Sequence, residues 1–341
     1  MKKSVQYSGG GMEIMAQLVK LQDYVSRYQI DLKRYPTQFI RLKKQQWDRT
    51  KEEWERGSFT SDWIEKEDEV VVEYEKKSLF SILFPNRKKE TTEEIDWQSD
   101  ELSEEVPNPE ESATLLFEPK LIYNPKTKEE LKRMYLDQLF HFQVKWASST
   151  LREKSYVDPK YMRDSMLRDL TQKLPDNYFL LYYPILKLKK APIELDIILI
   201  LPTEIVCIVV LEDKTSDAFI GSGERFWLKK SGKAEKKILN PTINLNRMES
   251  ILGQILQKHE IELPIKKVIL SRNGYIDYPG NSFNTEFIDA RKFPEWFLAL
   301  KSSHSPMKHM QFKAAQAILD LVQTTSYSRS SWELGSEEPN E

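Results

Sequence analysis

The residues best suited to chemistry are two carboxylates and a lysine at the ends of two apolar runs. Asp196 lies near the start of the run 195–201, and Glu212 and Lys214 directly follow the run 205–211. Because side chains alternate along a strand, Glu212 and Lys214 project to one face. Carboxylates that converge beside a lysine can hold Mg²⁺, activate water and neutralise the oxyanion of phosphodiester hydrolysis. These three residues therefore form a candidate site for that chemistry.

The spacing of these residues sets a geometric condition. A tight turn at 202–204 would pair Asp196 with about Val209, which leaves Glu212 about 10 Å further along its strand. A bulge, a strong twist or a frayed strand end must close that gap. The alternative is a surface cluster of salt bridges at the strand ends.

The elements around this group predict an α/β fold. We expect strands at 178–183, 195–201 and 205–211, and the last two are apolar on both faces, as central strands covered by helices are. Asp158 and Pro159 open a helix that ends near Leu174, and Asn240 and Pro241 open one that runs to about 258. Further strands are expected near 226–227, 268–270 and 287–288, with helices at 293–300 and 312–322.

The order of these pieces resembles the nuclease-related domain (NERD) family, a branch of the PD-(D/E)XK nuclease-like fold. The resemblance covers roughly residues 160–300, and the segments that carry it are 194–196, 208–214, Phe226 with Trp227, and Asn240 with Pro241. It implies a restriction-endonuclease-like mixed sheet flanked by helices. It also implies that Asp196 and Glu212 bind Mg²⁺ (or Mn²⁺) and that Lys214 is the catalytic lysine.

Two positions depart from the family pattern. Where the family usually has Gly and Glu on the first helix, this chain has Arg163 and Asp164, and where it usually has Gln after the Asn-Pro pair, this chain has Asn244. Asp164 and Asn244 keep the functional group and shorten its reach by one methylene. This change would tighten the site or mark one that has lost activity.

The N-terminal segment 12–57 has the pattern of a helical heptad region. Its apolar residues alternate steps of four and three, as in a coiled coil that pairs with a second copy or a partner protein: Ile14, Leu18, Leu21, Val25, Tyr28, Leu32, Tyr35, Phe39 and Leu42. Pro36 predicts a kink or a hairpin. Lys20, Arg34, Lys43 and Lys44 lie between these positions and would contact a phosphate backbone, or form the solvated face of a packed helix.

The remaining segments complete the predicted organisation. Residues 58–112 form an acidic, largely disordered linker, 113–157 a helical connector, 158–323 the nuclease-related α/β domain and 324–341 a disordered tail. Translation is expected to begin at Met12, after a glycine run. A single cysteine and the lack of a long apolar stretch predict a cytoplasmic protein that does not enter the membrane.

Two functions from different classes follow from these observations. The leading hypothesis is a Mg²⁺-dependent nuclease that acts on DNA or RNA. The rival is a catalytically inactive nuclease-fold module that binds a partner through its N-terminal helical region. The set Asp196, Glu212 and Lys214 favours the enzyme, whereas the shortened Asp164 and Asn244 favour the rival. The balance of 51 basic and 53 acidic residues excludes neither function.

Overall fold

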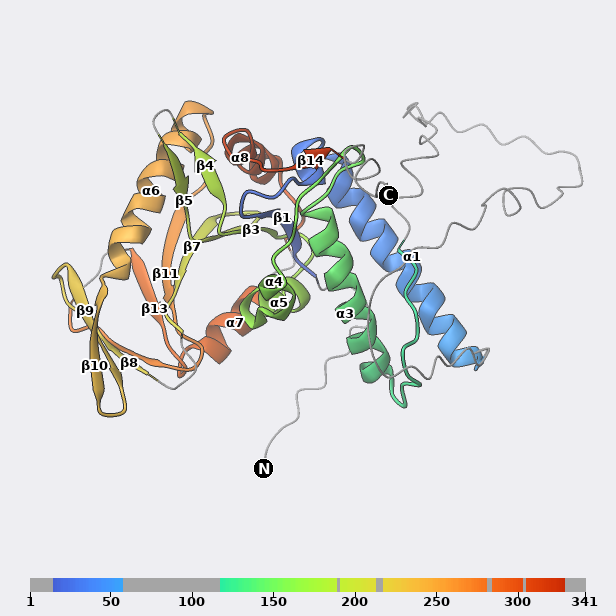
Figure 1. Cartoon of the computed structure of the whole chain (residues 1–341), viewed down its shortest axis with the longest axis horizontal. Coiled ribbons are helices and arrows are strands. Elements are labelled where there is room, and N and C mark those ends of the chain that lie inside the picture. The colour runs from blue at the N-terminus through green and yellow to red at the C-terminus, as the bar shows by residue number, and fades with distance from the viewer. Residues whose placement is uncertain are drawn as a thin grey trace, which may run out of the picture.

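A six-stranded mixed sheet forms the centre of the fold (Figure 1). The computed structural model describes residues 15–57, 117–188, 191–212, 217–280, 284–302 and 305–328. In spatial order the strands are β1 (Gln17–Leu21), β3 (Phe179–Tyr182), β6 (Ile197–Ile200), β7 (Ile205–Val210), β11 (Ile265–Leu270) and β13 (Thr285–Ile288). Strands β3, β6 and β7 are antiparallel, while β1 runs parallel to β3, and β11 and β13 run parallel to β7.

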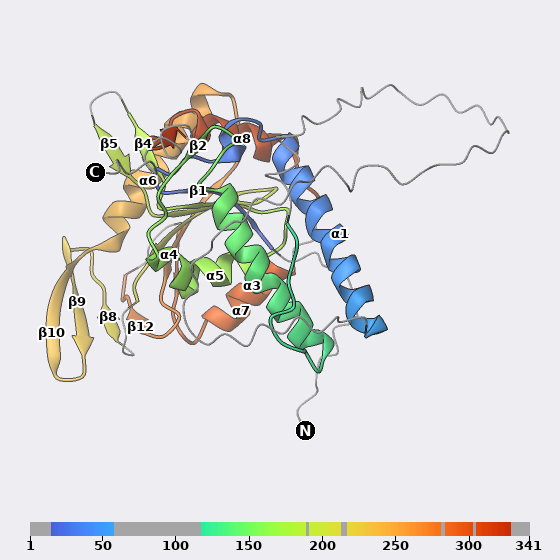
Figure 2. The same ribbon diagram turned by 45° about the vertical axis from the view of Figure 1, so that its right-hand side comes forward.

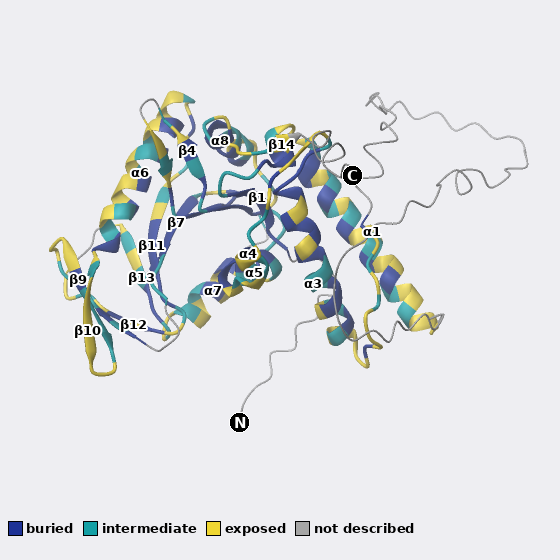
Figure 3. Ribbon diagram, in the orientation of Figure 1, coloured by how far each residue is buried: buried dark blue, intermediate teal, exposed yellow. Residues whose placement is uncertain are grey.

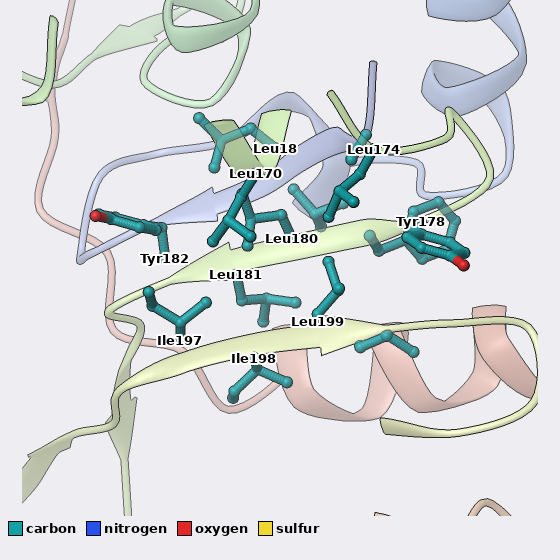
Figure 4. Close-up of a cluster of buried hydrophobic side chains, with 14 of the residues drawn as sticks. Leu18, Leu170, Leu174, Tyr178, Leu180, Leu181, Tyr182, Ile197, Ile198 and Leu199 are labelled. Atoms are coloured by element: carbon teal, nitrogen blue, oxygen red, sulfur yellow. The ribbon is translucent and has the colours of Figure 1, made fainter. Parts of the chain in front are cut away.

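The two apolar runs around the turn at 202–204 are central strands, as predicted. Every residue of β6 is buried, and only Val210 of β7 is partly exposed. Figure 4 shows Ile197 and Ile198 of β6 beside Leu180 and Leu181 of β3, and all four side chains are buried. The mixed α/β class expected from the sequence is therefore confirmed.

Helices cover both faces of this sheet (Figure 1, Figure 2). Helices α6 (Pro241–Lys258) and α8 (His309–Leu319) pack on one face. On the other face lie α3 (Lys128–Trp146), α4 (Lys160–Arg163), α5 (Ser165–Gln172) and α7 (Phe293–Lys301). Asn240 caps α6 by accepting a hydrogen bond from the Thr242 amide, and Pro241 follows in the first turn, as predicted. None of the described helices combines the length and apolar character needed to cross a bilayer.

The first half of the heptad prediction is wrong. Residues Gln17–Leu21 form strand β1, a short 3-10 helix follows at Arg27–Gln29, and helix α1 begins only at Arg34 and ends at Arg56. Strand β1 is buried on both faces because it lies against β3 under α3. Pro36 falls in the first turn of α1, where its missing N–H leaves no hydrogen bond unmade.

The apolar seam is nevertheless buried, inside this chain. Leu18, Tyr28, Tyr35 and Phe39 all belong to the core, and the Phe39 and Tyr35 rings pack against Trp146 of α3. Helices α1 and α3 lie side by side in both views (Figure 1, Figure 2). These side chains therefore pack within this chain and do not form an exposed coiled-coil seam.

Two of the four predicted phosphate contacts are contradicted by burial. The Lys20 ammonium is fully buried and donates to the Tyr24 carbonyl at 2.6 Å and to Gln29 Oε1 at 2.9 Å. Burial lowers the pKa of Lys20 to about 7. The Lys43 ammonium is 1% exposed and pairs with Asp176 at 2.7 Å. Both lysines therefore make buried contacts within the fold and are not available to bind phosphate.

The Lys43 pair leads to a stability prediction. Lys43→Met is expected to destabilise the chain by about 3 kcal/mol, because it leaves the Asp176 carboxylate without its buried cation. The matched control is Lys44→Met on the exposed neighbour, which should change stability by less than about 0.5 kcal/mol. Urea melts of both variants measure the difference. Equal stability of the two variants would contradict the structural role of Lys43.

The tail prediction is corrected at its beginning. Residues Tyr327–Ser328 form strand β14, which pairs with β2 (Glu153–Lys154), and the Thr325 amide donates to the Asp23 carbonyl at 2.7 Å. The start of the tail is therefore anchored by backbone hydrogen bonds. Residues 329–341, the acidic linker 58–112 and Met12 lie outside the described residues.

A second, smaller sheet lies beside the carboxyl end of β7. Its strands, in spatial order, are β10 (Ala234–Leu239), β9 (Phe226–Ser231), β8 (Ala218–Ile220) and β12 (Tyr275–Asp277). A separate hairpin pairs β4 (Ile185–Lys187) with β5 (Pro192–Glu194). The burial-coloured view shows that β10 is largely exposed and β9 mostly half-buried, in contrast to the central sheet (Figure 3). Of this small sheet, only the start of β9 was predicted from the sequence.

Candidate functional site

One end of the central sheet gathers polar residues from several elements. Strand β3 ends there and β6 begins there, while β7 and β11 both finish at the same level, with Val210 beside Leu270. The residues at this sheet end are Asp164, Ser165, Asp169, Tyr182, Tyr183, Asp196, Glu212 and Arg272. Three of the predicted site residues, Asp164, Asp196 and Glu212, are thus placed at one end of the sheet.

Asp164 breaks the predicted first helix into α4 and α5. Its carboxylate caps α5 by accepting hydrogen bonds from the Met166 amide at 2.9 Å and the Leu167 amide at 3.1 Å. The Tyr182 hydroxyl donates to its second oxygen at 2.6 Å. Asp164 is therefore committed to a local structural task while it also faces the sheet end.

Asp196 is a half-buried carboxylate just before β6. Its pKa is raised to about 6, chiefly by burial; the Arg247 guanidinium of α6 opposes the shift and the nearby Glu194 charge adds to it. Arg247 also donates to the Glu194 carbonyl at 3.2 Å, which holds this guanidinium beside the carboxylate pair. A carboxylate whose pKa lies near neutrality can exchange a proton at physiological pH.

The register of β6 and β7 agrees with the predicted difficulty. Ile197 pairs with Ile208 in a regular ladder, so Asp196 lies opposite Val209 and Glu212 lies three residues further on. Within the described pairs no bulge closes this gap. Glu212 makes its contacts with Arg272 instead.

Arg272 holds both oxygens of Glu212. Its Nε and Nη2 donate to Oε1 and Oε2, each at 2.7 Å, and its backbone amide donates to Oε1 at 2.8 Å. Its Nη1 also reaches Asp169 at 2.8 Å, and Nη2 reaches Ser165 Oγ at 3.0 Å. The side chains of Arg272 and Glu212 are only 17% and 16% exposed. This is a largely desolvated bidentate pair, which is stronger than a surface salt bridge.

Arg272 and Asp169 are site residues that were not predicted from the sequence. A signal for Arg272 is present, because only Ser271 separates it from the apolar run 268–270. A charged residue placed close to the end of a buried strand calls for a partner at the same sheet end.

Tyr183 stands among the carboxylates. Burial raises the pKa of its hydroxyl, and the charges of Asp196, Asp164, Glu194 and Glu212 raise it further, in that order. Its backbone has a φ of 49°, a left-handed conformation that a tyrosine rarely adopts. Strained backbone of this kind collects at functional sites. Tyr183 is thus a further candidate residue that the sequence did not indicate.

The other predicted site residues are placed less centrally or lie outside the described part. Asn244 is partly buried on the first turn of α6, and Lys214 falls in the segment 213–216, outside the described residues. On α1, Arg34 is half-buried and Lys44 is exposed. Their proposed contacts with phosphate stay predictions.

The described carboxylates do not fit a metal ion as they are arranged. Among the described residues, no three His, Cys, Asp or Glu side chains meet in a way that could hold one. Glu212, one of the two predicted ligands, gives both oxygens to Arg272. The Mg²⁺ (or Mn²⁺) site therefore stays a prediction from the sequence. Arg272 argues against it, because this guanidinium occupies both oxygens of Glu212.

One comparison with known proteins found a similar protein. Over 133 residues the chain is 32% identical to a protein named RNA 2′,3′-cyclic phosphodiesterase from Geobacillus stearothermophilus. The match covers 38% of this chain and 37% of that protein, so the chain spans little more than a third of that relative's length. No protein-family model matches the chain, and no solved structure matches it.

Proposed function

We propose that this chain hydrolyses phosphodiester bonds in nucleic acid, with its site at the end of the central sheet where β6 begins and β7 ends. The observation that carries the proposal is that a half-buried carboxylate, Asp196, lies at the same sheet end as the Glu212–Arg272 pair and the capping residue Asp164, around Tyr183. The relative named as an RNA 2′,3′-cyclic phosphodiesterase supports the same class of bond. Nucleic acid is accordingly the proposed substrate.

The order of elements supports the finer, nuclease-related form of the proposal. Helix α5 is followed by the antiparallel strands β3, β6 and β7, then by the crossover helix α6 and the parallel strand β11. Asp196 and Glu212 flank β6 and β7 in this unit, as the PD-(D/E)XK resemblance implies. We therefore retain this family as the proposed origin of the site.

The described side chains can assist phosphodiester hydrolysis in two ways. Asp196, with a pKa of about 6, is ionised at neutral pH and can accept a proton from an attacking water or hydroxyl. Arg272 presents a planar guanidinium, which binds phosphate oxygens bidentately when it is freed from Glu212. Together they offer a base and an anion-binding group at one sheet end.

A hydrolysis assay tests the proposal. Purified chain is incubated with end-labelled single-stranded RNA, single-stranded DNA and a 2′,3′-cyclic nucleotide, each in Mg²⁺, Mn²⁺ or EDTA. We expect hydrolysis of at least one substrate, and a loss of roughly 10²–10⁴-fold in Asp196→Asn because the proton acceptor is removed. Glu118→Gln, at an exposed carboxylate before α3, is the control and should retain the wild-type rate. No hydrolysis by wild type in any of these mixtures would reject the proposal.

One observation favours the rival function, a catalytically inactive nuclease-fold module that binds a partner through its N-terminal helical region. Arg272 satisfies Glu212 completely, as a structural salt bridge would. In that case wild type would turn over no substrate, and Asp196→Asn would leave partner binding through the N-terminal region intact. The same assay, read beside a binding measurement, separates the two functions.

A further inference from the structure

The small sheet β10-β9-β8-β12 has one buried face and one exposed face. On the buried face lie Trp227, Phe219 and Ile276, which are 1%, 3% and 6% exposed. Pairing places Lys229 beside Phe219 and Phe219 beside Ile276, so these three share a face. Because neighbours along a strand point to opposite faces, Phe226, Lys230, Ala218 and Tyr275 lie on the other side.

The exposed face carries two aromatic rings that point to solvent. Phe226 on β9 and Tyr275 on β12 are each 49% exposed, although both are large apolar or amphipathic side chains. Leu239, paired directly opposite Phe226, is 46% exposed. Strand β8 lies between β9 and β12, so the two rings are roughly 10 Å or more apart. They can therefore contact different parts of one ligand.

Each ring has a guanidinium beside it. Arg225 lies 5.6 Å from the centre of the Phe226 ring, and Arg291 lies 5.7 Å from the centre of the Tyr275 ring. Arg291 is also paired with Asp289. A ring with an adjacent cation suits a base that stacks while its phosphate is neutralised.

The β9–β10 hairpin adds positive charge to the same edge of the molecule. Residues 224–239 contain six basic side chains and two acidic ones: Arg225, Lys229, Lys230, Lys233, Lys236 and Lys237, against Glu224 and Glu235. Lys229 pairs with Asp217 and Lys230 with Glu235. Lys233, Lys236 and Lys237 are exposed and form no ion pair with any residue that the structure describes. Figure 3 shows the hairpin projecting from the fold, with β10 largely exposed.

This surface adjoins the proposed site at both of its ends. Only five residues separate Glu212 from Ala218 at the start of β8. At the other end, Leu239 of β10 is followed at once by Asn240, which caps α6, the helix that carries Asn244 and Arg247. The chain therefore connects the small sheet to Glu212 at one end and to the first turn of α6 at the other, so a nucleic-acid strand bound on this sheet can extend toward the proposed site.

We propose that the exposed face of the small sheet binds single-stranded nucleic acid. The rings of Phe226 and Tyr275 stack on bases, and Arg225, Lys233 and Lys237 contact phosphates. A single strand fits better than a duplex because its unpaired bases can reach exposed rings, whereas duplex bases are already stacked on one another. This inference deepens the proposed function and rests on it for the identity of the ligand.

The test measures binding where hydrolysis plays no part. The full chain carrying Asp196→Asn is titrated in EDTA against labelled single-stranded RNA, single-stranded DNA and blunt duplex DNA, and the anisotropy is followed over a range of salt. We expect both single strands to bind more tightly than the duplex. Phe226→Leu with Tyr275→Leu should weaken single-strand binding roughly 10- to 100-fold, because stacking is lost while apolar area is kept. Phe226→Trp should retain it.

The charge variants give an independent readout. Arg225→Gln, Lys233→Gln and Lys237→Gln together should reduce the slope of log affinity against log salt by about 2, since each phosphate contact on a single strand contributes about 0.7. The matched control replaces Lys120, Lys126 and Lys128 by Gln, exposed residues before and at the start of α3 on the other side of the fold. The control slope should equal that of the parent.

Two results would overturn the inference. The first is an unchanged salt slope in the charge variant, and the second is unchanged single-strand affinity in the Leu variants. Failure of the proposed function would give a different result: nucleic acid would still bind to the small sheet, but the wild-type chain would hydrolyse no substrate. Conversely, a variant that loses single-strand binding but still hydrolyses a cyclic mononucleotide would show that the exposed face of the small sheet is distinct from the hydrolytic site.

Discussion

Asp196→Asn is expected to stabilise the chain at neutral pH by about 2 kcal/mol, which raises the melting temperature by roughly 4–8 °C. Burial raises the pKa of Asp196 from 3.8 to about 6, so the folded chain holds a carboxylate charge at a cost in free energy. The full shift corresponds to about 3 kcal/mol, and partial exposure of the side chain reduces it. The same variant should lose hydrolysis, since asparagine cannot accept the proton.

The pH dependence of this stability difference shows whether the buried charge of Asp196 causes it. A carboxyl group whose pKa is raised on folding contributes stability that is fully present below its unfolded pKa of 3.8 and is lost as pH rises through about 6. The advantage of Asp196→Asn over wild type should therefore vanish near pH 4 and grow through about pH 6. Calorimetric melts across this range measure it. If the variant melts below wild type at every pH, Asp196 is a structural partner and not a strained functional charge.

The central strands and α6 could be predicted because their signals are local. The runs 195–201 and 205–211 are continuously apolar and are bounded by a turn, so few arrangements other than buried central strands suit them. Asn240 and Pro241 carry the capping oxygen and the fixed φ of a helix start, and α6 begins at Pro241. Each of these signals is contained within a few neighbouring residues.

The parts that were missed depend on contacts between distant segments. The apolar spacing from Leu18 to Leu32 suits a helix, but the free edge of β3 offers Gln17–Leu21 a strand partner some 160 residues away in sequence. Arg272 likewise meets Glu212 across 60 residues and Asp169 across 103. No local pattern shows which cation will pair with a given carboxylate. The sequence therefore indicated Glu212 as a site residue but not its pairing with Arg272.

Arg272→Met is expected to destabilise the chain by about 4 kcal/mol, the larger of the two effects on stability. The variant removes the guanidinium from Glu212 and Asp169 together and leaves two partly buried carboxylates facing one another. Asp169 keeps Lys173 at 2.5 Å, so most of the loss should fall on Glu212. Adding Glu212→Gln should therefore recover a large part of it, and a double-mutant cycle gives the coupling energy. Arg49→Met, which breaks an exposed pair with Glu53, is the control and should cost less than about 0.5 kcal/mol.

The same variants decide whether Glu212 can bind Mg²⁺. If Glu212 is a metal ligand that Arg272 occupies, millimolar Mg²⁺ should raise the melting temperature of Arg272→Met, because the cation takes the place of the guanidinium. The rise should be absent in the double variant with Glu212→Gln and small in wild type, where Arg272 competes. Mg²⁺ that leaves the Arg272→Met melt unchanged would remove Glu212 from the predicted metal site and leave the pair as a structural salt bridge.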